Sequence, residues 1–495
     1  MSIVDNTQNA DQELQQYGYK VEFRRELRRF ASFAIGFSFI SITTGIFTTY
    51  GSVLGWGGPL GIWTWPFVVV GQLLVALVFA ALSDRIPIAG YSYQWASRLA
   101  NPKVGWLIGW VSFTFLTVVV VSVDYAIAQV VLPSLLNYTE TAQNAWLVTA
   151  LIIIVQLLLI LLSTRWSTRV NNAAVGTEVI GIVGLTVLLL IVGAVRGLLH
   201  PDHLFSTGIV SPAGYFNPGG LFSTGPFMLS FLLGAYTIVG FEAAANLAEE
   251  TENAHRIVPF AMWFSVLLSG IVGFAFLIAL NLASGDIKAL SASATPVADI
   301  VTQTLGVVVG DIFLLFVTFS IFACGLVIYI TLTRLIWAMS RDQRFPGYQV
   351  FRQVNPRTDS PFAATLLAGI LCEIVLAIFG NLPNVLPNLF GAATLLPAII
   401  YLSTVILYVS TRRRLPPARG FSLGSFEWPV IVLSIAWLVF ELAIFRDASF
   451  ATPWIYTLVM IALGLIYFVW MLVRRPDVLR TPPQEGTSVE ANTAV

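Results

Sequence analysis

Apolar stretches of about 20 residues recur along nearly the whole chain, and they limit the possible folds more than any other feature. A helix needs about 20 apolar residues to cross the hydrocarbon layer of a bilayer. Lipid cannot satisfy backbone N–H and C=O groups, so such stretches must form helices that bond internally. Charged residues make up 11% of the chain, against about 25% in soluble domains. The sequence predicts an all-α polytopic membrane protein embedded in a lipid bilayer.

Hydropathy and the positions of Gly and Pro divide the chain into twelve predicted transmembrane helices. The expected spans lie roughly at 31–55, 60–82, 104–132, 144–163, 171–195, 222–247, 258–281, 306–339, 361–380, 386–410, 426–445 and 452–473.

The Lys and Arg residues support this order of spans, because such residues gather in cytoplasmic loops. With the N-terminus in the cytoplasm, only Arg196, Lys288 and Arg446 of the 26 fall outside. Spans one and six then cross in opposite directions, which predicts a 5+5 inverted repeat. The expected parts are a cytoplasmic tail 1–29, a transporter core 30–410 with repeats at about 30–196 and 221–410, helices 11 and 12 in 411–474, and a cytoplasmic tail 475–495.

Two of the apolar segments contain small and hydroxylated runs at matching places, one in the first span and one in the sixth. The runs are Ser41-Ile42-Thr43-Thr44-Gly45 and Gly234-Ala235-Tyr236-Thr237-Ile238-Val239-Gly240. Small residues also occur where two helices pack closely, which is the alternative interpretation. A matched pair of interruptions in two halves is instead typical of a transporter's binding site at mid-membrane depth.

Four segments carry a resemblance to a known family. They are Gly240-Phe241-Glu242 followed by Glu249-Glu250, Asn253 and Pro259; Thr43-Thr44-Gly45-Ile46; Pro87-Ile88-Ala89-Gly90-Tyr91-Ser92-Tyr93; and Arg341-Asp342-Gln343-Arg344-Phe345-Pro346. In these segments and their order, residues 25–475 resemble the amino acid–polyamine–organocation permease superfamily. Gln343 stands where that superfamily usually has Gly. Gly57-Gly58-Pro59 and Ser38-Phe39-Ile40-Ser41 look closest to its amino acid/choline branch.

The resemblance and the physics of a broken helix suggest how a substrate binds. The N–H groups at the start of a half-helix suit a carboxylate, and freed carbonyls suit an ammonium group. Tyr236 matches the position of an aromatic gate in the superfamily, although a packed aromatic is the alternative. The predicted substrate-binding residues are Ser41, Ile42, Thr43, Thr44, Gly45, Ile46, Tyr236, Thr237 and Gly240.

Acidic residues lie within the predicted spans, whereas no Lys or Arg lies deep in any of them. The acids are Asp124, Glu178, Glu242, Glu373 and Glu441. Ionisable groups inside a membrane are functional candidates, and acids without basic partners favour a proton, another cation or an amine. Glu178, Glu242 and Asp124 are the predicted coupling or gating residues. Some proton-coupled relatives carry Lys at the Glu178 position, beside the first helix.

Together these features predict a secondary transporter of the plasma membrane that moves an amino acid or related small amine by alternating access, with proton-coupled symport. A polyamine, choline or 4-aminobutyrate permease, an amino acid exchanger, a channel and a receptor are the alternatives. No nucleotide-binding, catalytic or metal-binding motif predicts an enzyme or a cofactor, and no basic tract predicts a nucleic-acid partner. His200-Pro201-Asp202-His203 lies in an outer loop and could bind zinc, but it is interpreted as polar residues of a solvated loop. Cys324 and Cys372 are interpreted as small buried apolar residues.

Overall fold

The computed structural model describes residues 27–136, 138–139, 141–162, 164–355 and 360–480. Most of the predicted N-terminal tail, and the C-terminal tail from residue 481, lie outside the described residues. The described part of the chain consists of helices and the loops between them, and its element order contains no β-strand. The long helices are α2 (Arg29–Ile40), α3 (Ile42–Trp56), α4 (Trp65–Arg85), α5 (Tyr91–Leu99), α6 (Pro102–Ala126), α8 (Ala142–Leu162), α9 (Thr164–Arg196), α13 (Ala254–Ala283), α15 (Pro296–Leu305), α16 (Val307–Arg341), α18 (Phe362–Phe379), α19 (Val385–Thr411), α20 (Glu427–Ile444) and α21 (Ala451–Arg474).

Shorter elements connect these helices or interrupt them. They are α7 (Leu132–Leu136), α10 (Pro226–Leu229), α11 (Phe231–Thr237), α12 (Ala243–Asn246), α14 (Ile287–Ala292), α17 (Tyr348–Phe351), a π turn η2 (Ile127–Val131), and 3₁₀ turns η1 (Pro59–Thr64), η3 (Pro201–Leu204), η4 (Ala248–Glu250), η5 (Arg412–Arg414), η6 (Gly424–Phe426), η7 (Ala448–Phe450) and η8 (Pro476–Leu479).

Eleven helical stretches of the described residues are long and apolar enough to cross a membrane. They match eleven of the twelve predicted spans, with two clear differences in length. The third continues through η2 and α7 to Leu136, and α9 begins at Thr164, two turns before the expected residue 171. The sixth predicted span, 222–247, is the exception, because it consists of the short helices α10, α11 and α12. The interruption predicted within this span is present as non-helical backbone between α11 and α12.

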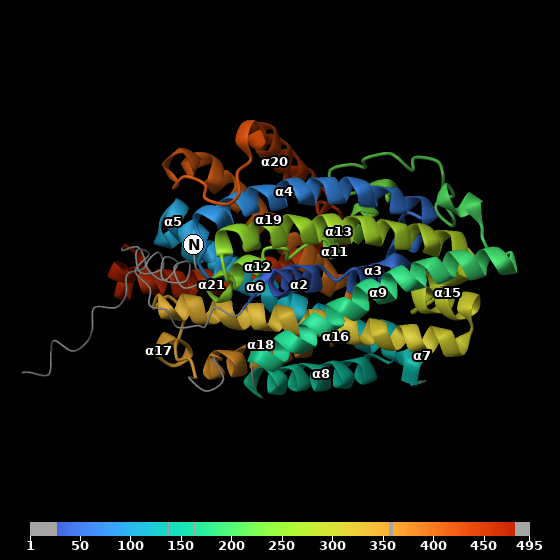
Figure 1. Ribbon diagram of the computed structural model, residues 1–495, viewed down its shortest axis with the longest axis horizontal. Coiled ribbons are helices and arrows are strands. Elements are labelled where there is room, and N and C mark those ends of the chain that lie inside the picture. The colour runs from blue at the N-terminus through green and yellow to red at the C-terminus, as the bar shows by residue number, and fades with distance from the viewer. Residues whose placement is uncertain (1–26, 137, 140, 163, 356–359, 481–495) are drawn as a thin grey trace, which may run out of the picture.

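The helices lie side by side along the long axis of the molecule (Figure 1). α5 and α17 lie toward one end, here called the charged end, and α7 and α15 toward the opposite end, here called the loop end. The loop end also carries the long connection from residue 197 to 225, where Arg446 donates to Gly220 O at 3.0 Å. Arg196, at the end of α9, donates to Thr304 O there. These two residues, predicted to lie outside, therefore share one end of the bundle.

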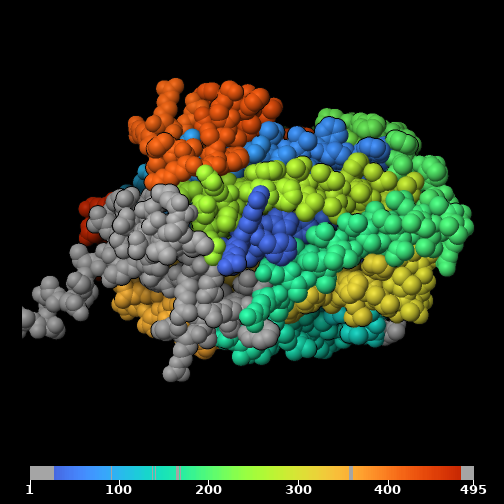
Figure 2. All heavy atoms as spheres, viewed as in Figure 1, coloured from blue at the N-terminus to red at the C-terminus, as the bar shows by residue number. Residues whose placement is uncertain are grey.

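The two half-helices of the first span, α2 and α3, occupy the centre of the bundle. α2 packs against α13, α9 and α16, and α3 packs against α11, α15 and α16. Figure 2 shows the start of α2 reaching the surface between α13 and α9. Nearly all side chains of α2 and α3 are buried, so neither helix presents an apolar face to lipid.

The outer helices instead expose large apolar side chains. Ile180 and Val195 of α9 are 75% and 84% exposed, and Ile466 and Val473 of α21 are 69% and 72% exposed. Such a surface would aggregate in water, but it suits contact with lipid tails. Largely buried central helices and an apolar outer surface are the pattern of a multi-pass membrane protein.

Candidate functional site

The first helix is broken at Ser41, between α2 and α3. Ser41 adopts φ 36° and ψ 95°, a backbone conformation that non-glycine residues rarely adopt. Its hydroxyl accepts a hydrogen bond from Thr44 N at 3.3 Å, and its carbonyl accepts from Gly45 N at 3.0 Å. Ser41 is thus the N-cap of α3, whose first N–H groups have no partner within the helix.

Glu178 of α9 binds this exposed helix start. Its Oε1 accepts from Thr43 N at 3.2 Å and from the Ser41 hydroxyl at 3.1 Å, and it lies 2.9 Å from the Thr43 hydroxyl. The Glu178 side chain is buried, as are Ser41 and Thr43. A carboxylate is favoured at a helix N-terminus, where free N–H groups and the helix dipole attract negative charge. Among the five intramembrane acids, Glu178 is the one that the structure joins to the first break.

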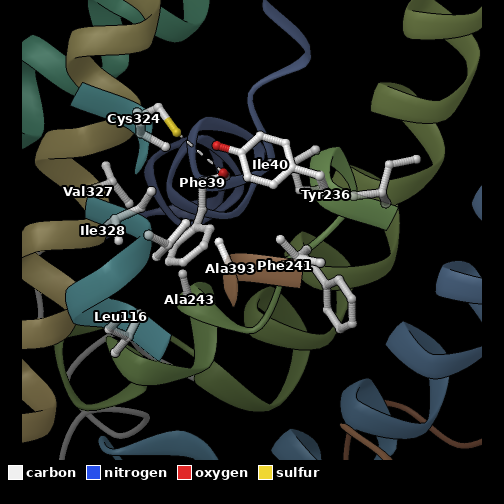
Figure 3. Close-up of a cluster of buried hydrophobic side chains, with 14 of the residues drawn as sticks. Phe39, Ile40, Leu116, Tyr236, Phe241, Ala243, Cys324, Val327, Ile328 and Ala393 are labelled. Carbon is white, nitrogen blue, oxygen red and sulfur yellow. Dashed lines mark hydrogen bonds between the residues drawn. The ribbon is translucent and has the colours of Figure 1, made fainter. Parts of the chain in front are cut away.

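α16 completes the surroundings of this break with two residues that the sequence analysis did not identify as site residues. Ser320 Oγ lies 2.9 Å from the Thr43 hydroxyl. The Cys324 thiol points to Phe39 O at 3.4 Å, just before the break (Figure 3). Cys324 is buried and free, as expected, yet it also contacts a backbone carbonyl of the broken helix. No local motif marks either residue, since α16 is apolar along most of its length.

The second break lies between α11 and α12, slightly later than predicted. Residues 234–237 are helical, and the backbone leaves the helix at Ile238 and re-enters it at Ala243. Gly240 has φ +80°, which explains why a glycine ends the predicted run. The Tyr401 hydroxyl of α19 accepts from Gly240 N at 2.8 Å and donates to Glu242 Oε2 at 2.7 Å. A tyrosine from a distant helix therefore closes the second break.

The two breaks pack directly against each other. A methyl group at Gly45 of α3 would overlap the Thr237 side chain at the end of α11. A methyl group at Gly240 would overlap the ring of Phe39 at the end of α2. Figure 3 shows Phe39, Ile40 and Tyr236 gathered at this junction. The glycines allow the two interrupted backbones to approach at mid-bundle, in side-chain contact.

Tyr236 lies at the same junction. Its hydroxyl is 3.0 Å from Ser122 Oγ of α6, and its ring meets that of Phe390 of α19 edge to face, with centroids 5.8 Å apart. Tyr236 is only 4% exposed. Its ring is held by two neighbouring helices, and it lies next to Thr237, the residue that touches Gly45.

Most of the backbone donors predicted for a substrate carboxylate are engaged within the protein in this conformation. Thr43 N is bound to Glu178, Thr44 N to the Ser41 hydroxyl, and Gly45 N to Ser41 O. The next residue, Ile46, is fully buried within α3. A carboxylate ligand therefore gains Thr43 N only if Glu178 releases it.

Asp124 and Glu441, two further acids of the predicted spans, bond to glutamine side chains of other helices. Asp124 of α6 accepts from Gln156 Nε2 of α8 at 2.8 Å, and its Oδ1 faces Gly325 of α16. Glu441 of α20 accepts from Gln72 Nε2 of α4 at 3.1 Å. Within the described residues no hydrogen bond joins Asp124 to either break. Asp124 thus bonds α8, and it lies beside Gly325, the neighbour of Cys324, which contacts the first break.

Three of the motif segments meet at the charged end, directly beyond the second break. Arg341 binds Glu249 through two nitrogens, each at 3.1 Å, and Ala89 N donates to Glu249 Oε1 at 3.0 Å. Gly90 N donates to Asn246 Oδ1 at 2.9 Å. Arg334 Nε lies 3.1 Å from Glu250 Oε1. These contacts tie the segment after the second break to the loop after α4 and to the end of α16.

Comparison with known proteins agrees with this architecture. The family model described as amino acid permease matches residues 27–470. An uncharacterized amino-acid permease of Schizosaccharomyces pombe is 29% identical over 74% of this chain and 68% of its own length. The amino-acid permease BAT1 of Arabidopsis thaliana is 26% identical over 88% of each chain. The choline transporter of Saccharomyces cerevisiae is 23% identical over 86% of this chain and 76% of its own.

The family match covers both breaks, the Glu178 contact and the charged-end segments. It confirms the resemblance that the four sequence segments carry. The chain belongs to the amino acid permease family of the amino acid–polyamine–organocation superfamily.

Proposed function

We propose that this protein is a secondary transporter that carries an amino acid or related small amine across the plasma membrane by alternating access. The observation that carries the proposal is the pair of broken helices, packed against each other at mid-bundle and bound by Glu178 and Tyr401. Broken helices of this kind form the central binding sites of transporters. Family membership and the names of the relatives support the substrate class.

The proposed topology counts the broken sixth segment as a crossing, which gives twelve transmembrane helices. The helices on either side of this segment support the crossing. α9, which precedes it, ends at the loop end, where Arg196 bonds Thr304 O. α13, which follows it, begins at the charged end, where His255 lies beside Asp84 near the C-terminal end of α4. These positions support a crossing of the bundle by the segment between them. We further propose the inverted repeats 30–196 and 221–410, with the helices of 411–474 outside them and both termini in the cytoplasm.

The substrate site that we propose is the junction of the two breaks. The start of α3 supplies N–H groups for a carboxylate, and the end of α11 supplies carbonyls of Tyr236 and Thr237 for an ammonium group. Tyr236 covers the junction as the proposed gate. An amine without a carboxylate, as in a choline-type substrate, would use the carbonyl side alone.

Glu178 gives this site a mechanism of coupling. As a carboxylate, it occupies Thr43 N and the Ser41 hydroxyl, which are the donors that a substrate carboxylate needs. Once Glu178 takes up a proton, its negative charge is lost and its hold on these donors weakens. A proton on Glu178 and a carboxylate at the start of α3 therefore bind together, which is the requirement of symport. In an exchanger without a coupling ion, this competition between Glu178 and the substrate carboxylate would have no role.

Opening toward the charged end requires the contacts beyond the second break to separate. The Arg341–Glu249 pair and the Ala89 N–Glu249 bond hold this end closed, and Glu249 is buried while the Arg341 side chain is 9% exposed. Glu242 and Tyr401 link the same segment to α19. We propose that these contacts break when the inward-facing state forms, with Glu242 as a gating residue. Asp124 keeps a proposed supporting role in coupling through α6.

The experiment that tests this function is uptake of a radiolabelled panel of amino acids, polyamines, choline and 4-aminobutyrate into proteoliposomes. The expected result is uptake above that of protein-free vesicles, stimulated by an inward proton gradient. Tyr236→Ala and Glu242→Gln are expected to impair this uptake, whereas Glu441→Gln, in a buried carboxyl between α4 and α20, serves as the matched control. Uptake of no member of the panel would contradict the proposed substrate class.

A further inference from the structure

Two histidines and an aspartate meet in the loop after α9, far from the breaks. The donor atoms of His200, Asp202 and His203 all lie within 4.8 Å of one another. The two imidazole rings stack at a centroid distance of 5.0 Å and an interplanar angle of 22°. His203 Nε2 lies 3.8 Å from Asp202 Oδ2. We propose that these three side chains bind a zinc-type divalent metal ion at the loop end.

The hydrogen bonds of His203 favour a metal between the side chains. The Ser284 hydroxyl donates to Asn281 O at 2.6 Å, so its oxygen accepts from His203 Nδ1 at 2.9 Å. Nδ1 then carries a hydrogen, and Nε2, 3.8 Å from Asp202 Oδ2, is the ring nitrogen left to bind a metal. A cation between Nε2 and the carboxylate would attract both groups. Metal-bound histidines commonly donate their second ring nitrogen to an oxygen in this way.

The backbone holds the three residues in place before any metal arrives. Pro201 begins the 3₁₀ turn η3, and His200 N donates to Leu282 O at 2.7 Å. Trp63 Nε1 donates to Leu204 O at 2.8 Å at the other end of the turn. The Asp202 side chain is 77% exposed and free to rotate inward. Only the side chains must therefore shift, to donor distances of about 2.0–2.2 Å from the ion.

The donor set selects the class of metal. Two imidazoles and one carboxylate suit Zn²⁺ and neighbouring transition metals, whereas Mg²⁺ and Ca²⁺ prefer oxygen ligands alone. Three protein ligands leave a fourth position for water. The site thus accepts a metal ion directly from the solution at the loop end.

A bound ion would immobilise His203 and His200, which already bond Ser284 and Leu282 O at the end of α13, and so would strengthen the contact between the loop and α13. This consequence rests on the proposed transport function, because opening at the loop end requires these segments to move apart. We expect zinc at this site to slow uptake. Zinc binding itself does not depend on the transport proposal and is tested separately.

The binding test uses the purified full chain in detergent and Co²⁺ as a spectroscopic probe. One equivalent of Co²⁺ is expected to give visible absorption that Zn²⁺ abolishes. His200→Ala and Asp202→Asn, both at exposed side chains, are expected to remove the signal, and Ser284→Ala is expected to weaken binding by about tenfold. His255→Ala is the matched control, since the third histidine of the chain bonds Asp84 O at the charged end. Equal Co²⁺ absorption in wild type and His200→Ala would overturn the site.

The transport test adds Zn²⁺ to proteoliposomes during uptake of a substrate identified by the panel. Inhibition is expected in the wild type and in His255→Ala, and it is expected to be lost in His200→Ala. Normal Co²⁺ binding with uptake that ignores Zn²⁺ would overturn the regulatory consequence. Since Co²⁺ binding needs no transport, failure of the transporter proposal and failure of the metal site give different results.

Discussion

The two helix breaks use opposite arrangements to satisfy their polar groups. At the first, the acid comes from another helix: Glu178 of α9 accepts from Thr43 N and Ser41. At the second, the acid belongs to the break itself, and Tyr401 of α19 bridges Glu242 and Gly240 N. At the first break a carboxylate thus binds the backbone N–H directly, whereas at the second the Tyr401 hydroxyl stands between Gly240 N and the Glu242 carboxylate. This difference suggests that the first break carries coupling and the second carries gating.

The closeness of the two breaks makes Gly240→Ala the most damaging change. Left-handed backbone with a Cβ costs roughly 1–2 kcal/mol, and overlap with Phe39 adds about 1–3 kcal/mol. We expect a loss of about 2–5 kcal/mol in the free energy of unfolding, measured with denaturant in detergent. Gly55→Ala in α3 is the matched control, because a methyl group there meets open space. If both variants unfold alike, the breaks do not depend on close packing.

Tyr401→Phe tests the hydroxyl that closes the second break. The variant leaves the buried Gly240 N–H and the Glu242 carboxyl without this partner, which costs about 1–3 kcal/mol in the free energy of unfolding. The matched control is Tyr329→Phe, since Tyr329 donates only to a helix carbonyl, Thr365 O, at 3.1 Å. A Tyr401→Phe variant no less stable than this control would show that the second break holds without α19.

Ser122→Ala probes the contact between α6 and the proposed gate. Losing the hydrogen bond to the Tyr236 hydroxyl is expected to cost about 0.5–1.5 kcal/mol of stability. Faster uptake of labelled substrate is also expected, because a less restrained Tyr236 moves more readily. Ser434→Ala, which removes only a bond within α20, provides the reference. An unchanged uptake rate in Ser122→Ala would leave Tyr236 as a packed aromatic.

The sequence predicts the helical membrane fold and the first break well, because both depend on local composition. Ser41 marks the first break correctly, but the second lies nearer Gly240 than Gly234, since only Gly240 needs a positive φ. Placement of Glu178 beside the first helix follows from the resemblance to relatives. The fold and the family are thus readable from patterns within single segments and from their order.

The partners from distant helices escape prediction. Tyr401 and Ser320 come from α19 and α16, which are apolar around most of their circumference, so hydrophobic periodicity does not indicate which side faces the centre. The partner of Asp124 shows the same limit: the sequence identifies the acid in the span, but not its hydrogen bond with Gln156 of α8. Contacts across the bundle depend on how each helix is rotated about its own axis. The sequence of a helix that is apolar on nearly all sides does not indicate this rotation.

The central claim is that a proton on Glu178 releases the start of α3 to a substrate carboxylate. The most direct measurement follows internal pH with a trapped dye in proteoliposomes while an amino acid identified by the uptake panel is added outside. We predict substrate-driven acidification in the wild type and in the Glu441→Gln control. In Glu178→Gln we predict no acidification, although exchange of labelled for unlabelled substrate continues. Acidification in Glu178→Gln equal to that of the wild type would contradict the account.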